Sequence, residues 1–184
     1  SSNETIELMK VSVKNISRKP LTITATSAIP LFGRSLANKH DHEQVTSLLN
    51  RIEQVNEGIV VRPTMAFNEE GHKEIDTVYF VFAQQDKAIN PVGSFPTVES
   101  FIGETGNMLS PEAIINEQKP SKLKDDLLQG KEAIGALQFK QITLKPNQSI
   151  DYIVGFGIAR SSNEAKAIFN KFNNVESFNK SLKA

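Results

Sequence analysis

Three histidines are the residues of this chain best suited to metal or acid–base chemistry: His40, His42 and His72. His40 and His42 are two positions apart, a spacing that on a strand would turn both imidazoles to one face, where they could share a metal ion. Cupin-type sites add a glutamate a few residues later, but Thr46 and Ser47 occupy that part of the chain. We therefore predict no metal site, and a cupin-like metal enzyme is the least favoured function. His72 follows a turn and is predicted at a hairpin tip.

Two pairs of adjacent carboxylates are the next candidates for catalysis, Glu69 with Glu70 and Asp125 with Asp126. Glycoside hydrolysis needs two carboxyl groups roughly 5–10 Å apart across a substrate, whereas neighbours in sequence do not face one site. The chain has no cysteine, no Gly-x-Ser-x-Gly nucleophile turn and no glycine-rich phosphate loop. The sequence therefore predicts no catalytic residue within this chain.

The composition excludes several other classes of function. The 184 residues carry 21 basic and 21 acidic side chains, and no run of lysine or arginine interrupts this balance. A nucleic-acid-binding protein needs a basic surface that releases counterions, so we expect no nucleic-acid partner. No stretch approaches the ~20 apolar residues of a membrane span, and the first residues do not resemble a signal peptide. We expect a cytoplasmic protein without a membrane partner, and the lack of cysteine agrees with a reducing compartment.

The elements that must position any site are mostly strands. Apolar and polar residues alternate with period two, which is typical of strands with one buried face. Residues 6–14 and 21–26 are predicted to form an antiparallel hairpin, and the continuously apolar residues 78–82 are predicted to be buried on both faces. Residues 150–158 also alternate, with Gly155 and Gly157 on the face where a backbone or ligand comes close.

Other segments are helical or irregular. Residues 44–55 fit a helix or a strand, and a change of phase after residue 139 predicts a bulge near Lys140. Thr97 is expected to cap a short helix, and Ser110 followed by Pro111 is expected to begin another. Ser161 with a glutamate three residues later forms a capping box. We predict a mainly β protein, an antiparallel β-sandwich with a C-terminal helix or helix pair.

Several of these stretches, in this order, are similar to the N-terminal β-sandwich of the cellobiose phosphorylase family, inverting glycoside phosphorylases of the glycosyltransferase 36 type. Residues 29–35, 41–42 and 45–49 especially resemble the β-1,2-oligoglucan phosphorylase branch. The other similar stretches are residues 11–16 with 20–21, 99–103, 111–114, 142–148 and 154–157.

The resemblance implies a supersandwich of the galactose-mutarotase type. Residues 1–160 would be the sandwich, incomplete on its N-terminal side, and 161–184 would lead to a helical (α/α) barrel that carries the catalytic aspartate and the phosphate site. The chain would then be a non-catalytic fragment of an enzyme that acts on β-linked glucosides or oligosaccharides, with inorganic phosphate as co-substrate and no cofactor. Residues 44–55 become more strand-like under this interpretation.

The resemblance also suggests where the sandwich would meet sugar. Loops 34–43 and 68–76 would reach the rim of the active site or a dimer contact, and planar hydrogen-bonding side chains suit sugar hydroxyls. The candidate substrate-binding residues are Arg34, Asp41, His42, Glu70 and His72. An open sheet edge would also favour a homodimer. The alternative is a free-standing carbohydrate-binding module, but the chain has no tryptophan and only two tyrosines, both in apolar strand patterns.

Overall fold

The computed structural model describes residues 4–32, 47–68 and 71–181. Strands dominate this part of the chain, and short helices follow the ninth strand and close the C-terminal end. The elements, in chain order, are β1 (Ile6–Lys14), β2 (Leu21–Ile23), β3 (Thr26–Leu31), β4 (Asn50–Val55), β5 (Gly58–Pro63), β6 (Met65–Asn68), β7 (Gly71–Glu74), β8 (Val78–Gln85), β9 (Gly93–Thr97), α2 (Val98–Ile102), α3 (Glu112–Ile115), the 3-10 helix η2 (Asp125–Leu127), β10 (Ala133–Gln138), β11 (Ile142–Leu144), β12 (Ser149–Ala159), α4 (Ser162–Asn170) and α5 (Val175–Ser181).

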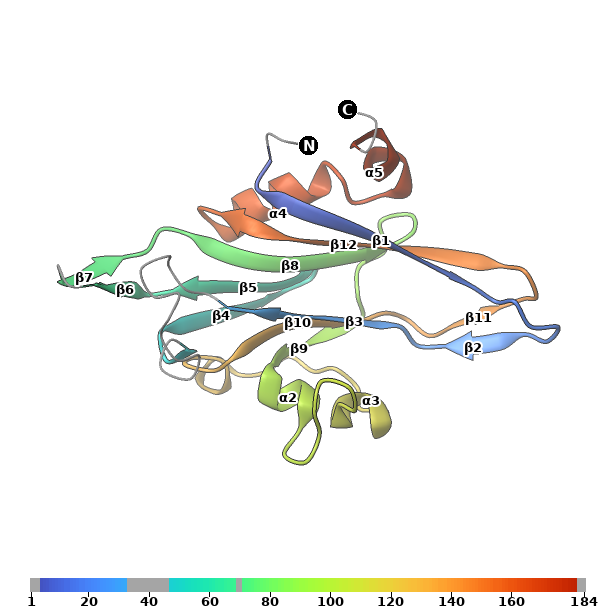
Figure 1. The fold of residues 1–184 in the computed structure, drawn as a ribbon, viewed down its shortest axis with the longest axis horizontal. Coiled ribbons are helices and arrows are strands. Elements are labelled where there is room, and N and C mark those ends of the chain that lie inside the picture. The colour runs from blue at the N-terminus through green and yellow to red at the C-terminus, as the bar shows by residue number, and fades with distance from the viewer. Residues whose placement is uncertain (1–3, 33–46, 69–70, 182–184) are drawn as a thin grey trace.

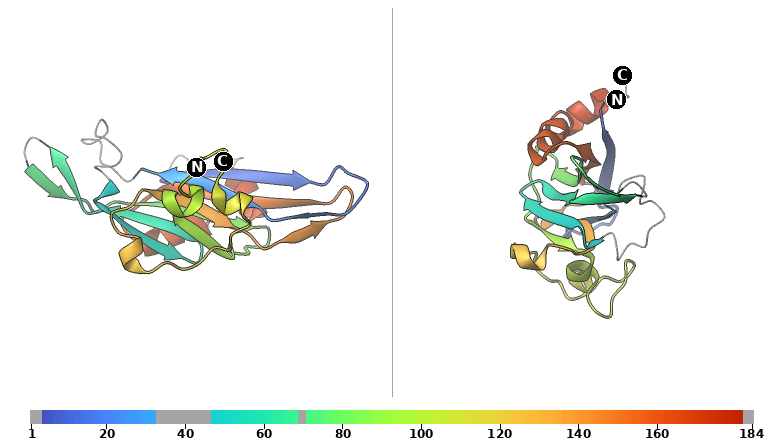
Figure 2. Two further views of the ribbon diagram at one scale, coloured as in Figure 1. Left: turned by 90° about the horizontal axis from the view of Figure 1, so that it is seen from below. Right: turned by 90° about the vertical axis from the view of Figure 1, so that its left-hand side faces the viewer.

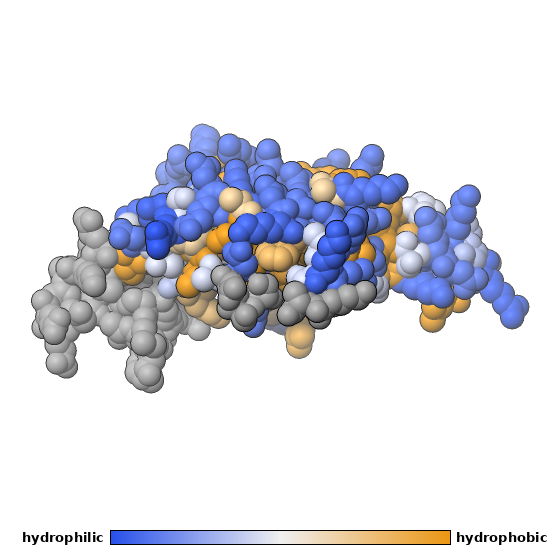
Figure 3. Space-filling view, turned by 90° about the horizontal axis from the view of Figure 1, so that it is seen from above, coloured by the Kyte–Doolittle hydropathy of each residue, from blue (hydrophilic) through white to orange (hydrophobic). Residues whose placement is uncertain are grey.

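The fold is an antiparallel sandwich, which confirms the predicted fold class. A five-stranded sheet in the order β1-β12-β8-β5-β4 faces a three-stranded sheet in the order β3-β10-β9. Helices α4 and α5 cover the outer face of the larger sheet, and α2 and α3 lie under the smaller one (Figure 1). Two-stranded ribbons, β6–β7 and β2–β11, extend from opposite ends of the sandwich (Figure 2). The face that carries α4 and α5 is mostly hydrophilic, with apolar patches between the polar side chains (Figure 3).

Apolar side chains fill three layers of core. Val81 and Ala83 of β8 belong to the core between the sheets, whereas Phe80 and Phe82 face the helices and pack with Phe169 of α4. Strand β8 is therefore buried on both faces, as its continuously apolar sequence predicts. A third cluster, which includes Phe101, joins the smaller sheet to α2 and α3.

The predicted pairing of residues 6–14 with 21–26 is wrong. Strand β1 pairs with β12 over its whole length, and β2 pairs with β11. The buried side chain of Asn15 explains this arrangement, because its Nδ2 donates to the carbonyls of Lys19 (2.9 Å) and Leu144 (2.8 Å). Its backbone N–H also donates to the carbonyl of Gln148 at 2.9 Å. These bonds fasten the β1–β2 connection to the β11–β12 connection. The strands on either side of the two connections therefore pair with each other, β1 with β12 and β2 with β11.

The structure has no bulge near Lys140 within one strand. Instead, the chain passes at this point from one sheet to another. Strand β10 ends at Gln138 between β3 and β9, and the chain resumes at Ile142 as β11 beside β2. Of the ambiguous segment 44–55, residues 50–55 form strand β4, and residues 44–46 lie outside the described part of the chain.

The short helices follow their predicted signals in part. Thr97 caps α2 as expected. Helix α3 begins after Pro111, which itself occupies the capping position, so no side-chain cap from Ser110 forms. Ser161 caps α4 through the backbone N–H of Glu164, while the Glu164 carboxylate accepts from the N–H of Arg160 at 2.7 Å instead of closing the reciprocal box.

Gly155 and Gly157 lie where strand β12 approaches other parts of the chain. A Cβ at Gly155 would come 2.9 Å from Ile6 and 3.0 Å from the Phe169 ring, and one at Gly157 would overlap the Thr5 carbonyl oxygen. The predicted close approach is therefore made by a side chain of α4 and by the backbone that leads into β1. Within the described ranges, no helix is long and apolar enough to cross a membrane.

Candidate functional site

Four of the five candidate sugar-binding residues lie outside the described part of the chain: Arg34, Asp41, His42 and Glu70. His40 of the histidine pair also lies outside it. The backbone of His72 lies on β7, opposite Phe67 of β6. The assignments of these residues to sugar binding remain predictions, and the geometry that follows concerns the described residues around them.

In the sequence, the stretch that carries Arg34, Asp41 and His42 lies between β3 and β4. Leu31, the last residue of β3, pairs with Ala133 of β10. Asn50, the first residue of β4, is buried; its carbonyl accepts from Gly130 N–H at 2.9 Å and its Nδ2 donates to the Lys131 carbonyl at 3.1 Å. The two ends of the stretch are thus fixed beside one turn, residues 130–132.

A pocket of about 250 Å³ opens at this turn, and we call it the rim pocket. Hydroxyl, carboxylate and ammonium groups surround it, and every residue of its wall except the glycine has a polar side chain. It is lined by Ser47, Thr97, Glu99, Gly130, Lys131 and Glu132. Ser47 and Thr97 are buried, so these two side chains form its inner part.

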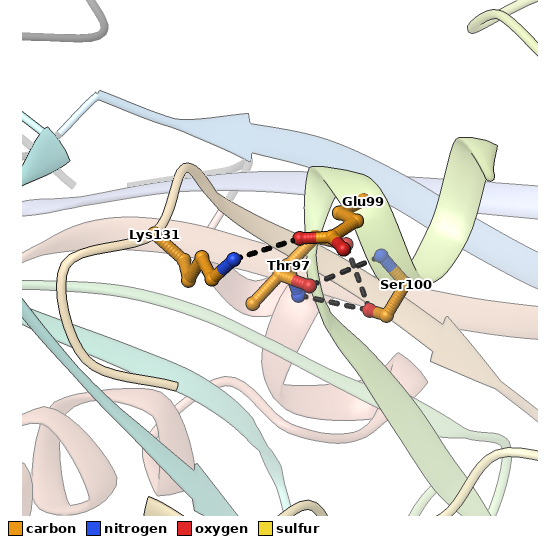
Figure 4. Close-up of polar contacts among 4 residues, drawn as sticks. All are labelled: Thr97, Glu99, Ser100 and Lys131. Atoms are coloured by element: carbon orange, nitrogen blue, oxygen red, sulfur yellow. Dashed lines mark hydrogen bonds and ion pairs between the residues drawn. The ribbon is translucent and has the colours of Figure 1, made fainter. Parts of the chain in front are cut away.

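The start of helix α2 fixes one wall of the rim pocket. Thr97 Oγ1 accepts from the N–H of Ser100 at 3.0 Å, and Ser100 Oγ accepts from the N–H of Thr97 at 3.1 Å (Figure 4). This reciprocal cap satisfies two N–H groups that the first helical turn would leave without partners. The N–H of Val98 donates to the Glu132 carbonyl at 2.9 Å, which joins the helix to the facing turn.

Glu99 and Lys131 form an ion pair in the wall of the rim pocket. Lys131 Nζ lies 3.0 Å from Glu99 Oε2, and both side chains are exposed (Figure 4). An exposed ion pair contributes about 0–1 kcal/mol to the free energy of unfolding, so this pair adds little to the stability of the fold. Carboxylate and ammonium groups at this spacing can instead accept from and donate to neighbouring hydroxyls of one sugar ring. No aromatic side chain of the described residues lines the pocket to provide a stacking surface.

A second pocket, of about 320 Å³, lies near the turn between β4 and β5. One of its polar side chains, Gln54, already has hydrogen-bond partners within the protein. Its Nε2 donates to Ser94 Oγ at 3.0 Å and to the Ser121 carbonyl at 3.2 Å, and its Oε1 accepts from Leu123 N–H at 2.8 Å. The amide therefore holds the 121–123 segment against the sandwich, and the rim pocket is the better candidate for a ligand.

The described residues do not form an obvious catalytic centre. Among residues 4–32, 47–68 and 71–181, no three histidine, aspartate or glutamate side chains gather as a metal ion would require. Asp125 and Asp126 lie exposed on η2, away from the rim pocket's lining. Groups with perturbed pKa lie elsewhere too: hydrogen bonds from Thr105 lower the pKa of Glu112, and burial raises the pKa of Tyr79 and Tyr152.

The sequence contained only part of the signal for this site. Glu99 and Ser100 stand in the stretch whose similarity to the phosphorylase family is noted above, but Lys131 lies 32 residues later and outside all the similar stretches. Only the fold brings the two charges together.

Comparison with models of known protein families gives a match. The family model described as glycosyl hydrolase 94, supersandwich domain, matches residues 1–175, which include every strand of the sandwich and helix α4. No curated protein matches the chain.

Proposed function

This chain belongs to the glycosyl hydrolase 94 supersandwich family, and from this premise we propose that it is the non-catalytic β-sandwich of an inverting glycoside phosphorylase. The proposed parent enzyme cleaves β-linked glucosides with inorganic phosphate, and the β-1,2-oligoglucan phosphorylase branch is our choice within the family. The observation that carries the proposal is the match over residues 1–175, together with a polar rim pocket whose wall contains the family-like residue Glu99.

In the proposed reaction, phosphate attacks the anomeric carbon as the glycosidic bond breaks. An aspartic acid of a separate helical barrel protonates the leaving oxygen, and the products are α-glucose 1-phosphate and the shortened acceptor. Residues 1–160 serve as the sandwich and residues 161–184 as the connection toward that barrel. Helices α4 and α5 pack on the outer face of the larger sheet, so a barrel that follows them would be attached to the sandwich through this packing.

The sandwich contributes binding rather than chemistry in this proposal. The rim pocket, with loops 34–43 and 68–76, holds a sugar unit distant from the bond that breaks. Binding energy gained there holds the substrate in the orientation needed for attack by phosphate, and this lowers the activation barrier. Glu99 and Lys131 join the five candidate residues as the hydrogen-bonding groups.

The test is phosphorolysis with and without the barrel. We expect this chain alone to release no glucose 1-phosphate from β-1,2- or β-1,4-linked gluco-oligosaccharides and phosphate, and the polypeptide that includes the barrel to release it. Product from the chain alone would refute the non-catalytic role. Faster reaction with β-1,4-linked substrates would reject the choice of branch.

A free-standing carbohydrate-binding module is the rival function. Such modules present exposed aromatic rings, but Tyr152 is buried against Phe139 and Tyr79 packs against the inter-sheet core. Calorimetric titration of the chain with the same oligosaccharides discriminates the two. Micromolar binding by the chain alone would favour the module, whereas weak binding that strengthens when the barrel is present supports the phosphorylase.

A further inference from the structure

The charges of this chain are balanced in the sequence but not in space. The β1–β2 connection and the β11–β12 connection lie side by side at one end of the molecule (Figure 1). We call residues 14–20 and 145–148 the basic tip, because they contain no aspartate or glutamate. Its exposed cations are Lys14, Arg18, Lys19 and Lys145. The other 17 basic and 21 acidic side chains leave the rest of the chain with a net charge of −4.

The four cations of the basic tip are not neutralised by neighbouring carboxylates. Within the described ranges, none of the four side chains forms an ion pair. Asp151 follows the tip on β12, but its carboxylate accepts from Ser12 Oγ and lies 3.7 Å from Lys10 Nζ. The positive charges of the tip therefore repel one another, and a negatively charged partner would remove this repulsion.

Hydrogen bonds hold the basic tip in one shape. The N–H of Asn15 donates to the Gln148 carbonyl at 2.9 Å, and the N–H of Asn147 donates to the Asn15 carbonyl at 2.8 Å. The N–H of Lys145 donates to the side-chain oxygen of Gln148 at 2.9 Å. The cations therefore project from two turns that are fixed to each other, so contact with a partner requires little ordering of the backbone.

An apolar side chain stands among these cations. Ile16 is 88 % exposed, and Leu21, where β2 begins, is also exposed. The tip projects beyond the sandwich as the end of the β2–β11 ribbon (Figure 2). A projecting point with cations and an aliphatic group suits an anionic bilayer, where headgroups attract the cations and the acyl boundary accepts the aliphatic group. Surfaces that bind single-stranded nucleic acid add aromatic rings for base stacking, and the sequence of the tip contains none.

We propose that the basic tip docks on the surface of an anionic lipid bilayer. The four cations lie among the negatively charged headgroups, and the Ile16 side chain enters the boundary between headgroups and acyl chains. The sequence-based expectation of no membrane partner considered spanning segments and signal peptides, whereas this contact is made by surface side chains. The separation of positive charge at the tip from negative charge elsewhere also turns the tip toward such a surface as the chain approaches.

Docking through the basic tip leaves the rim pocket open. Strand β3 begins at Thr26, close to the β2–β11 ribbon, and ends at Leu31, which pairs with Ala133 beside the turn that lines the rim pocket. The tip and the rim pocket therefore lie toward opposite ends of β3. This inference concerns location at a surface and is independent of the proposed sugar chemistry.

The expected binding is reversible and depends on charge. Each lysine or arginine close to an anionic bilayer raises affinity roughly fivefold, so four cations give a preference over neutral lipid on the order of a few hundredfold. Dissolved salt screens these charges and weakens the binding. The aliphatic side chain of Ile16 adds about a severalfold gain that salt does not remove.

Flotation of the whole chain with lipid vesicles tests the proposal. In about 0.05 M salt we expect binding to phosphatidylcholine vesicles that contain about 30 % phosphatidylserine, and no binding to pure phosphatidylcholine. Raising the salt to about 0.5 M should release the chain. A chain that does not float with the anionic vesicles at low salt, or that binds both compositions equally, would overturn the proposal.

A pair of double variants tests whether the tip is the binding surface. Arg18→Gln combined with Lys19→Gln removes two charges from the tip and should weaken vesicle binding roughly 25-fold. Lys119→Gln combined with Lys124→Gln is the matched control, because both lysines are exposed between α3 and η2 and the net charge of the variant is the same. Equal weakening in the two double variants would assign the effect to net charge and overturn the proposed surface.

Ile16→Ser separates a bilayer from a soluble polyanion. The exposed side chain contributes little to folding, so the variant should melt like the parent chain while its affinity for anionic vesicles at low salt falls about severalfold. Unchanged affinity of this variant would overturn the bilayer as the partner. Tighter binding of the parent chain to a single-stranded oligonucleotide than to the anionic vesicles would assign the tip to nucleic acid and overturn it equally.

Discussion

The Nδ2 of Asn15 donates a hydrogen bond of 2.8 Å to the carbonyl of Leu144, across 129 residues of sequence. The same buried amide bonds to Lys19, and its Oδ1 accepts from both the N–H (2.9 Å) and the Oγ (2.8 Å) of Ser17. One side chain therefore closes its own turn and fastens that turn to the end of β11. This gives a physical reason for an asparagine at position 15, which lies in the family-like stretch 11–16.

Replacing Asn15 should lower the stability of the whole sandwich. Asn15→Ala removes the donor and leaves buried carbonyls without it, which costs about 1–3 kcal/mol of unfolding free energy. Urea denaturation measures the loss. Ile16→Ala is the control, because Ile16 is 88 % exposed and should change stability by less than about 0.5 kcal/mol. Equal midpoints for the two variants would contradict the structural role of Asn15.

Gly157 should tolerate a methyl group less well than Gly155. The added carbon at Gly155 meets the ends of the Ile6 and Phe169 side chains, which can move, whereas at Gly157 it meets the backbone oxygen of Thr5. We expect Gly155→Ala to cost about 1 kcal/mol and Gly157→Ala about 3 kcal/mol or more. Thermal unfolding of the two variants gives the order directly, and the reverse order would show that the edge at Thr5 is free to shift.

Glu99→Gln should affect sugar binding and leave folding nearly unchanged. The exposed pair with Lys131 contributes about 0–1 kcal/mol, so the melting temperature should hardly move. In the polypeptide that includes the barrel, KM for oligosaccharide should rise severalfold while kcat remains similar, because the contact is made in both ground and transition states. Glu176→Gln, which breaks the exposed pair with Lys180, is the matched control and should leave both constants unchanged. Equal effects of the two variants would remove Glu99 from the binding role.

The carboxylate of Glu112 should respond to loss of Thr105. The Thr105 hydroxyl, followed by its N–H at 3.0 Å, holds the pKa of Glu112 below 4.5. A lowered pKa in the folded state stabilises the protein above the ordinary glutamate pKa, and that contribution disappears as the pH falls through the folded value. Thr105→Val should raise the pKa of Glu112 in an NMR titration. The stability difference between variant and parent should shrink as the solution is acidified below pH 4.5, and a difference independent of pH would contradict this account.

Local patterns predicted the strands better than their partners. Alternation over residues 6–14 and 150–158 depends only on neighbouring residues, and both segments are strands. Which strand lies beside which depends on contacts between distant residues, such as that of Asn15 with Leu144, and the simple hairpin prediction failed there. The rim pocket shows the same division. Thr97 was predicted as a cap from its local sequence, whereas the contact of Lys131 with Glu99 arises only when β9 and β10 pair.

The pairing of β1 with β12 delays the folding of β1 during translation, because its partner strand is made much later. The Thr5 hydroxyl bonds to the carbonyl of Ile158, 153 residues further on, so β1 gains its partner strand β12 only after residue 158 has left the ribosome. Such distant pairing folds slowly and leaves an apolar segment exposed meanwhile. Production in cells should therefore depend on chaperones that shield residues 6–14 during translation.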